Sequence, residues 1–206
     1  MTQTQMNPTN TALLAAAAQL SDAFSGRAAE FDEARRLSQD ASDAMAQAGF
    51  YRLFVPKHLG GLEASPLVSA KIFERLAQGN AACGWVAFIA ATSGSTLGNI
   101  PEDTARAIFS HPNTMVAGVF APSGKATVNA GEVTVDGRWQ WGSGTQNADW
   151  VLGGSLVDSG GDKPSQHMIL MPAQQVEFLD TWHVSGLQGT GSTDYEVKNL
   201  TLPDSH

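Results

Sequence analysis

The stretch PEDTARAIFSHPNTMVAGVFAPSGKATVN, residues 101–129, contains the change from helical to strand-like sequence that decides the fold. Its first part predicts a short helix over residues 101–109. That helix must end before His111 and Pro112, because the residue that precedes a proline is pushed out of helical geometry. From Thr114 onward, β-favouring runs alternate with Gly, Asn, Asp and Pro, a pattern typical of strands joined by turns.

The residues before this change predict helices. One apolar stripe recurs at intervals of three and four, as on one face of a helix. Its members are Leu13, Ala17, Leu20, Phe24, Ala28 and Phe31. A second helix is predicted over residues 38–48, and Gly49 supplies its left-handed stop.

Two more helices follow. Ser65 and Pro66 are typical of a helix start, in which a capping residue precedes a proline in the first turn. The buried face of this helix, which ends near Gly79, is expected to contain Leu67, Ala70, Phe73 and Leu76. Asn80 then opens AACGWVAFIAATSG, residues 81–94, which is apolar nearly all round and predicts a central, buried helix.

The second half predicts short strands. Residues 129–131 and the pair Asp136-Gly137 have the composition of hairpin turns. We therefore predict an α+β chain with an amino-terminal all-α domain over residues 8–112. An antiparallel β-barrel or sandwich domain follows over residues 113–206.

Composition excludes several classes of protein. The 206 residues carry a net charge of -8, so the chain lacks the broad basic surface that binds nucleic acid or anionic lipid. The start lacks the basic residues of a secretory signal, and Gly94 interrupts the apolar helix before it could span a bilayer. We expect a cytoplasmic protein with neither nucleic acid nor membrane as a partner.

Cysteine and histidine indicate no metal site. Cys83 is the single cysteine, so an intrachain disulfide is impossible, and the residue is interpreted as a small buried apolar side chain. The histidines show no spacing typical of metal ligands. They are His58, His111, His167, His183 and His206.

Three stretches in this order resemble the acyl-CoA dehydrogenase superfamily, and they cover most of the chain from Phe31 to Pro203. AGFYRLFVPKHLGGLEASP, residues 48–66, is similar to the segment that joins the family's early helices. DGRWQWGSGTQNADWVLGG, residues 136–154, is similar to a strand pattern of the family. VSGLQGTGSTDYEVKNLTLP, residues 184–203, resembles the turn and strand that close its β domain.

Within the superfamily, the details resemble the two-component monooxygenases, which hydroxylate aromatic or polycyclic substrates with reduced flavin from a separate reductase. The acyl-CoA dehydrogenases carry a Thr-Glu-Pro-Gly-x-Gly-Ser-Asp stretch that helps hold flavin and acyl-CoA. Here the corresponding VFAPSGKATVNAGEV, residues 119–133, lacks the acidic and Ser-Asp elements, which argues against acyl-CoA binding. NAACGWV, residues 80–86, is similar to the monooxygenase branch, where a Gly-Trp lies near the substrate pocket.

The resemblance implies five site residues. Trp141 and Ser143 correspond to positions that flank the flavin ring, as a packing aromatic and as a hydroxyl near the reactive nitrogen. A fixed donor there would stabilise developing charge better than mobile water does. Phe120 and Ala121 stand where the family passes its backbone against the flavin, and Trp85 would line the substrate pocket. The alternatives are core packing for both tryptophans, a turn for Ser143 and a plain strand end for Phe120.

The other polar motifs are weaker indicators of function. The turn Gly189–Ser192 offers N–H groups and hydroxyls to a phosphate, or it is a structural turn; no helix follows it, so neither a P-loop nor a dinucleotide fingerprint applies. Asp149 and Asp194 lie at a strand edge and a turn, and we expect neither to be catalytic.

The predicted function is that of a flavin-dependent oxidoreductase fragment. It would use reduced FMN or FAD and oxygen to hydroxylate an apolar or aromatic substrate, with a flavin reductase as electron source and a homo-oligomer in the full-length form. The family's carboxy-terminal four-helix bundle, which supplies the catalytic base, is expected to be absent, so the catalytic residues stay unknown. The alternatives are an acyl-CoA dehydrogenase, and a non-catalytic truncated remnant or one half of a split enzyme.

Overall fold

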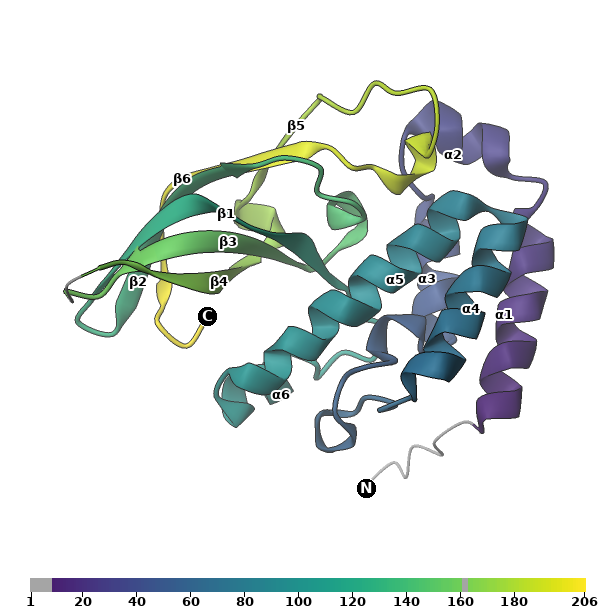
Figure 1. Cartoon of the computed structure of the whole chain (residues 1–206), viewed down its shortest axis with the longest axis horizontal. Helices are drawn as coiled ribbons and strands as arrows, with labels where there is room; N and C mark the ends of the chain where they lie inside the picture. Colours follow the sequence, from purple (N-terminus) through teal and green to yellow (C-terminus); the bar gives the residue numbers. More distant parts are fainter. Residues whose placement is uncertain (1–8, 161–162) are drawn as a thin grey trace.

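The computed structural model describes residues 9–160 and 163–206, and the predicted domain start at residue 8 lies outside them. Its first half is helical (Figure 1). The helices are α1 (Asn10–Phe24), α2 (Ala28–Ala34), α3 (Gln39–Gln47), α4 (Pro66–Gly79), α5 (Ala81–Ser95) and α6 (Glu102–Ile108). Short 3-10 turns are η1 (Phe50–Arg52), η2 (Lys57–Leu59) and η3 (Thr96–Asn99).

Several helix ends follow from local chemistry, as predicted. The Ser65 side chain caps α4 by accepting a hydrogen bond from the backbone N–H of Val68. Asn80 caps α5 by accepting from the N–H groups of Ala82 and Cys83 at 3.0 and 3.3 Å. Gly49 follows α3 with φ of +81°, the left-handed geometry that glycine adopts without a steric penalty.

The first predicted apolar stripe is wrong as a single helix, because the chain breaks at Gly26 between α1 and α2. Arg27 turns toward α3 there and binds Glu30 and Asp40, each at 2.8 Å. The two stripe ends still meet, since the rings of Phe24 and Phe31 pack edge to face at 6.2 Å. Ala28 is exposed, contrary to the stripe.

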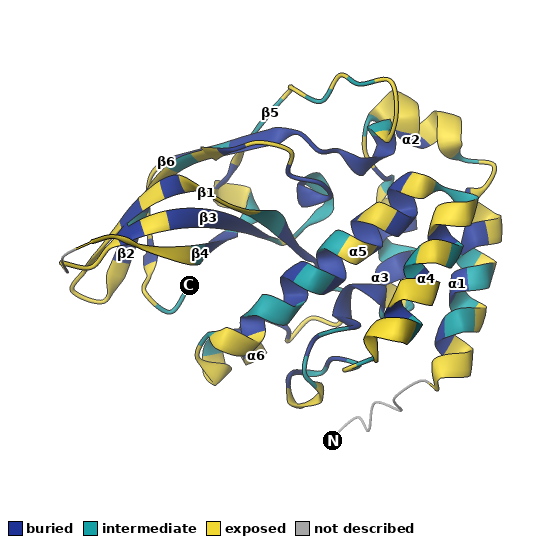
Figure 2. Ribbon diagram, viewed as in Figure 1, coloured by how far each residue is buried: buried dark blue, intermediate teal, exposed yellow. Residues whose placement is uncertain are grey.

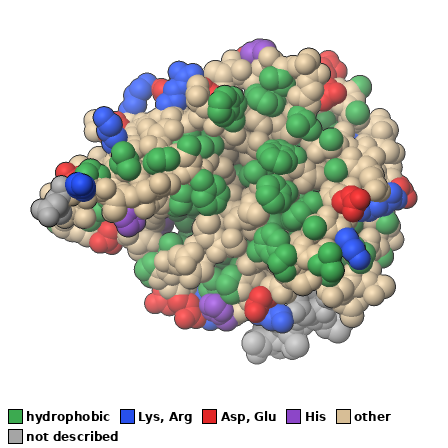
Figure 3. Space-filling view, viewed as in Figure 1, with side chains coloured by type: hydrophobic (Ala, Val, Ile, Leu, Met, Phe, Trp, Pro, Cys, Tyr) green, Lys and Arg blue, Asp and Glu red, His purple; other side chains and the backbone are tan. Residues whose placement is uncertain are grey.

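The predicted buried face of α4 is also wrong in part. Leu67 is 67% exposed and Ala70 is exposed, whereas Ser69, Ile72 and Leu76 are buried. The helix lies between α1 and α5, which contact it on the other stripe. Exposed apolar side chains therefore remain on the face of α4 and α5 that Figure 3 presents.

Helix α5 is the central core helix, as predicted. It contacts α4, η1 and β1, and most of its residues are buried (Figure 2). Gly94 does not interrupt the helix, contrary to the prediction: the helical segment Ala81–Asn99 is long and apolar enough to cross a membrane by composition alone, but 56% of its most apolar 18-residue stretch is buried inside the protein. That burial is typical of the core helix of a folded domain. Two large side chains of α5, Trp85 and Phe88, nevertheless stay partly exposed.

The second half is one six-stranded sheet in the order β4-β3-β1-β2-β6-β5. The strands are β1 (Val116–Asn129), β2 (Glu132–Trp139), β3 (Trp150–Asp158), β4 (Ser165–Pro172), β5 (Glu177–Leu179) and β6 (Asp194–Pro203). Between them lie the 3-10 turns η4 (Thr145–Asn147), η5 (Ala173–Gln175) and η6 (Gln188–Thr190). A helical region followed by a β-sheet confirms the predicted fold class, and the last helix and first strand lie on either side of residues 111–113.

Strand pairing departs from the prediction in two details. All neighbouring pairs are antiparallel except β1 and β3, which run parallel. The predicted turn at residues 129–131 is confirmed, with positive φ at Ala130 and Gly131. Asp136-Gly137 is no turn: it continues β2, and a Cβ at Gly137 would lie 2.6 Å from the ring of Trp139, so glycine is needed there for packing.

Candidate functional site

Trp85 of α5 contacts Ser143, which lies in the loop after β2. The indole Nε1 of Trp85 donates a hydrogen bond to Ser143 Oγ over 2.9 Å. The Trp85 ring also packs against Phe88, with ring centroids 5.5 Å apart, and 43% of Trp85 remains exposed. The structure thus brings together two predicted site residues from the helical and the β halves, at an open edge of α5.

A chain of buried hydroxyls continues from this contact. Ser143 Oγ lies 2.6 Å from Ser192 Oγ, which lies 2.6 Å from Thr190 Oγ1. The Thr190 hydroxyl in turn donates to the backbone carbonyl of Leu187 at 2.8 Å. Ser143, Ser192 and Thr190 are all less than a tenth exposed. The residue pattern gave no sign that the 189–192 turn lies against Ser143, because only the fold brings their hydroxyls together.

Backbone hydrogen bonds hold the two segments of this site together. Gly142 N–H donates to the Thr193 carbonyl at 2.9 Å, and Gly144 N–H donates to the Thr190 carbonyl at 2.8 Å. Gly189 fits tightly against the helical half, because a Cβ there would lie 2.8 Å from the Cβ of Phe31. The loop with Ser143 is therefore fixed on both sides, which is what a positioned hydroxyl requires.

Trp141 is the most exposed of the predicted site residues. Its side chain is 70% exposed, and its backbone has φ of +62°. A bulky residue in the left-handed region is uncommon, and such geometry persists where the surroundings enforce it. Its carbonyl accepts the N–H of Ser143 at 2.9 Å in a tight turn. Trp141 therefore presents its ring to solvent beside Ser143, so the core alternative does not hold for it.

Phe120 and Ala121 form part of a bulge in β1. Residues 120–123 stand opposite Gly154 alone, because the pairing with β3 passes from Val119↔Gly153 to Gly124↔Ser155. A Cβ at Gly154 would lie 2.3 Å from the Phe120 carbonyl oxygen, so only glycine lets the bulge approach. Phe120 is 49% exposed and Ala121 is exposed. Bulges of this kind re-aim side chains and backbone near functional sites.

Two buried aromatic side chains make hydrogen bonds to the backbone beside the bulge. Tyr195 accepts a hydrogen bond from Val119 N–H at 3.1 Å and donates one to the Leu152 carbonyl. Trp139 stacks on Tyr195 with ring centroids 5.3 Å apart, and its Nε1 donates to the Gly154 carbonyl at 2.7 Å. Burial raises the pKa of Tyr195, so the phenol stays protonated at neutral pH. The same aromatic pair therefore links the bulge to the strands on either side of Ser143.

The residues for which no catalytic role was expected make structural contacts or are buried. Asp194 binds Arg138 at 2.7 Å, and Asp149 accepts the N–H of Met115 at 2.8 Å. Cys83 is fully buried, and burial raises the pKa of its thiol to about 12. Within residues 9–160 and 163–206, no group of three His, Cys, Asp or Glu side chains is placed to hold a metal ion.

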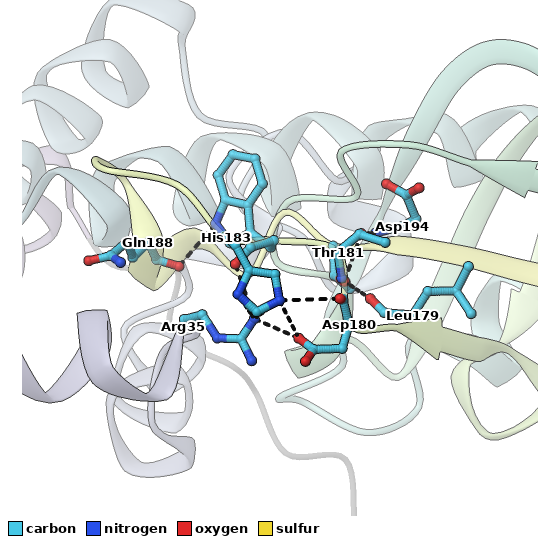
Figure 4. Close-up of polar contacts among 9 residues, drawn as sticks. Arg35, Leu179, Asp180, Thr181, His183, Gln188 and Asp194 are labelled. Carbon is cyan, nitrogen blue, oxygen red and sulfur yellow. Dashed lines mark hydrogen bonds and ion pairs between the residues drawn. The ribbon is translucent and has the colours of Figure 1, made fainter.

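An ion pair that the sequence did not reveal joins the helical half to the segment before β6 (Figure 4). Arg35, at the end of α2, binds Asp180 at 2.5 Å and donates to the Trp182 carbonyl at 3.2 Å. The Arg35 guanidinium holds the pKa of Asp180 below its ordinary value. The Trp182 indole donates to the Gln188 carbonyl at 3.1 Å. Residues 180–188, here named the clasped loop, are thereby tied to the helical half next to the hydroxyl chain.

A cavity of about 540 Å³ lies elsewhere, between η3 and the sheet. Its lining includes Leu97, Leu152, Ile169 and His206 and none of the five predicted site residues. The candidate site is instead an open face formed by Trp85, Trp141 and Ser143, with the β1 bulge as a separate exposed feature.

Comparison with known proteins agrees with this geometry. Residues 7–101 match the family described as acyl-CoA dehydrogenase, N-terminal domain. The indole-3-acetate monooxygenase of Pseudomonas putida is 35% identical over 178 residues, which are 85% of this chain and 45% of that protein. The oxygenase component of the FADH(2)-dependent resorcinol hydroxylase of Rhizobium sp. is 30% identical over 195 residues, 93% of this chain and 47% of that protein.

A solved structure shows the same fold. The crystal structure of the HsaA monooxygenase from M. tuberculosis superposes with a TM-score of 0.88 at 29% identity, covering 96% of this chain and 55% of that one. The chain spans about half the length of the curated relatives that it matches. Over residues 7–101 the chain matches the acyl-CoA dehydrogenase N-terminal domain, and over most of its length it is similar in sequence and fold to flavin-dependent monooxygenases.

Proposed function

We propose that the chain is the flavin-binding part of the oxygenase component of a reduced-flavin monooxygenase. The observation that carries the proposal is the Trp85–Ser143 hydrogen bond, which joins an exposed aromatic ring to a fixed hydroxyl. The relatives' names, monooxygenase and hydroxylase oxygenase component, support the same reaction class. Reduced flavin bound here would supply the two electrons with which one atom of molecular oxygen is inserted into an apolar or aromatic substrate and the other is released as water.

The residues present fit a planar ring with a polar edge. Trp141 offers an exposed aromatic face, and Ser143 beside it offers a buried hydroxyl. The exposed bulge at Phe120 and Ala121 offers backbone groups whose use does not depend on side-chain identity. Such a combination of apolar surface with a few placed polar groups is typical of cofactor sites. In the proposed arrangement Trp141 packs against the flavin and Ser143 holds a hydrogen bond at its reactive nitrogen.

Trp85 is proposed to line the substrate pocket. The hydrogen bond from its Nε1 to Ser143 restrains the orientation of the ring, which packs against Phe88. Rigid aromatic surface of this kind binds flat apolar molecules at low entropic cost. A substrate held there would lie close to the Ser143 hydroxyl, which places it near the reactive edge of the flavin.

The partners follow from this scheme. A separate flavin reductase would supply reduced FMN or FAD, in line with the word component in one relative's name. The exposed apolar side chain of Leu67 on α4, outside the proposed substrate pocket, supports burial against further protein in a homo-oligomer. We place the reaction in the cytoplasm, where such a reductase can reach the protein.

Calorimetric titration without oxygen tests the proposal. The purified chain is titrated with reduced FMN, oxidised FMN and FAD, and we expect reduced FMN to bind. Ser143→Ala should weaken that binding about fivefold, the worth of one hydrogen bond. Ser155→Ala, which removes another buried hydroxyl bonded only to the Gly153 carbonyl, should leave it unchanged.

Two results would count against the monooxygenase. Absence of binding by every flavin at accessible concentrations would mean that this chain carries no flavin site of its own. Tight retention of oxidised flavin, with bleaching on addition of an acyl-CoA, would favour an acyl-CoA dehydrogenase instead.

A further inference from the structure

The hydroxyl chain has a fixed hydrogen-bond direction at its far end. Each serine or threonine hydroxyl has one hydrogen to donate, and a carbonyl oxygen can only accept. Thr190 Oγ1 lies 2.8 Å from the Leu187 carbonyl oxygen, so its one hydrogen points there. The Thr190 hydroxyl is then available to its other neighbour, Ser192, only as an acceptor.

The remaining directions follow one after another. Ser192 donates to Thr190 across 2.6 Å, so it has no hydrogen left for Ser143. Ser143 therefore donates to Ser192, also across 2.6 Å. At its other side, Ser143 accepts from the indole N–H of Trp85, which can only donate. All of these bonds run in one direction, from Trp85 toward Leu187.

This direction leaves the Ser143 hydroxyl with one free lone pair and no free hydrogen, so Ser143 is an acceptor there and not the fixed donor that the resemblance implied. The reactive N5 nitrogen carries a hydrogen in reduced flavin and a bare lone pair in oxidised flavin. We propose that Ser192 and Thr190 are positioning residues that present Ser143 as a hydrogen-bond acceptor, and that they thereby make the site prefer reduced over oxidised flavin. The inference rests on the proposed function, because it requires flavin at Ser143.

Reversal of the chain has a definite cost. For Ser143 to donate to oxidised flavin, Ser192 must donate to Ser143 and Thr190 must donate to Ser192. The bond from the Thr190 hydroxyl to the Leu187 carbonyl is then lost. One such bond corresponds to about a fivefold difference in affinity. The hydrogen bonds of the chain also polarise one another, so each bond is stronger than it would be alone.

Two variants test the inference by the ratio of reduced to oxidised FMN affinity. Ser192→Ala frees the Ser143 hydrogen by removing its acceptor. Thr190→Val frees it too, because Ser192 can then turn and donate to Ser143. We expect each variant to lower the ratio about fivefold. Ser192→Thr keeps the hydroxyl and should restore the ratio, and Ser69→Ala, which removes a buried hydroxyl on α4, should not change it.

A purely structural role for Ser192 would weaken both flavin forms equally, and an unchanged ratio in both variants would overturn the inference. A second readout needs no flavin. The Trp85 indole N–H resonance in a ¹⁵N–¹H spectrum should move upfield in Ser192→Ala, because Ser143 becomes a weaker acceptor once it no longer donates. It should stay in place in Ser69→Ala.

The two readouts separate this inference from the proposed function. If the wild-type chain binds no flavin, the proposed function fails, while the indole resonance still reports whether Ser192 is coupled to Ser143. An indole resonance that does not respond to Ser192→Ala overturns the inference whatever the flavin result.

Discussion

Tyr195→Phe removes a single hydroxyl group, but it should destabilise the sheet more than so small a change suggests. The phenol hydroxyl accepts the N–H of Val119 at 3.1 Å and donates to the Leu152 carbonyl, and the residue is fully buried. Val119 stands at the start of the β1 bulge, where pairing with β3 is interrupted. Removal of the hydroxyl therefore takes the acceptor from the half-buried N–H of Val119 and the donor from the buried carbonyl of Leu152.

The magnitude follows from these two losses. The Val119 N–H left without this acceptor costs about 2 kcal/mol and the lost bond to the Leu152 carbonyl about 1 kcal/mol, so the free energy of unfolding should fall by about 3 kcal/mol. For a chain of this size, that change lowers the melting temperature by about 6 to 12 °C. Urea unfolding followed by circular dichroism measures both variant and wild type under one set of conditions.

The sequence offers a matched control, since it contains only two tyrosines. Tyr51 is also buried, but its hydroxyl bonds a single side chain, Ser42, at 2.9 Å. Ser42 can turn its hydroxyl elsewhere, so Tyr51→Phe should cost about 1 kcal/mol. Equal losses in the two variants would refute the reasoning that Tyr195 holds the bulge.

Three further predictions concern charge, reactivity and packing. Because the Arg35 guanidinium lowers the pKa of Asp180 in the folded protein, the salt bridge stabilises the clasped loop above the ordinary pKa of 3.8 and is lost as pH falls below it. The protection of amides in that loop, relative to their intrinsic exchange rates, should therefore fall below about pH 3.8, and Asp180→Asn should remove this dependence. Cys83, with its pKa raised to about 12, should resist iodoacetamide at neutral pH until the chain unfolds, and labelling of the folded protein at the rate of a free thiol would contradict its burial. Gly153→Ala would place a Cβ 2.6 Å from a buried indole and should cost about 1 to 3 kcal/mol in urea unfolding, whereas Gly186→Ala, with nothing within 4 Å, should cost almost nothing.

Features set by neighbouring residues in the sequence were predictable. Ser65 and Asn80 cap helices with their own side chains, and Gly49 takes the left-handed geometry that ends α3. Positive φ at Ala130 and Gly131 closes a hairpin where the composition predicted one. These outcomes depend on contacts within about four residues, so the rest of the fold cannot override them easily.

Features set by distant partners were not predictable. Which face of α4 is buried depends on where α1 and α5 pack against it. Leu67 lies on the face that contacts neither helix and is exposed. Asp136-Gly137 has the composition of a turn, yet it continues β2. Glycine is needed there because a Cβ at position 137 would clash with the Trp139 ring. Parallel pairing of β1 with β3 leaves no local signature either.

The candidate site shows the same division. The resemblance picked out Trp85 and Ser143, and the structure brings them into contact. The hydroxyl of Ser192 was missed as a partner, because its closeness to Ser143 arises only when residues 49 positions apart fold together. The flavin and substrate roles of Trp141, Ser143, Phe120, Ala121 and Trp85 stay predictions for the binding experiments above.

The order of strands in the sheet bears on how the chain is made. Strand β6 is synthesised after the other five but lies between β2 and β5. Until it emerges from the ribosome, β2 has an open edge, and Trp139 lacks the Tyr195 ring that covers it. Pairing across so long a separation is slow, and an open apolar edge is a template for association with other chains. The nascent protein is therefore prone to aggregation until β6 has emerged, and the hydroxyl chain can form only once Thr190 and Ser192 have been made.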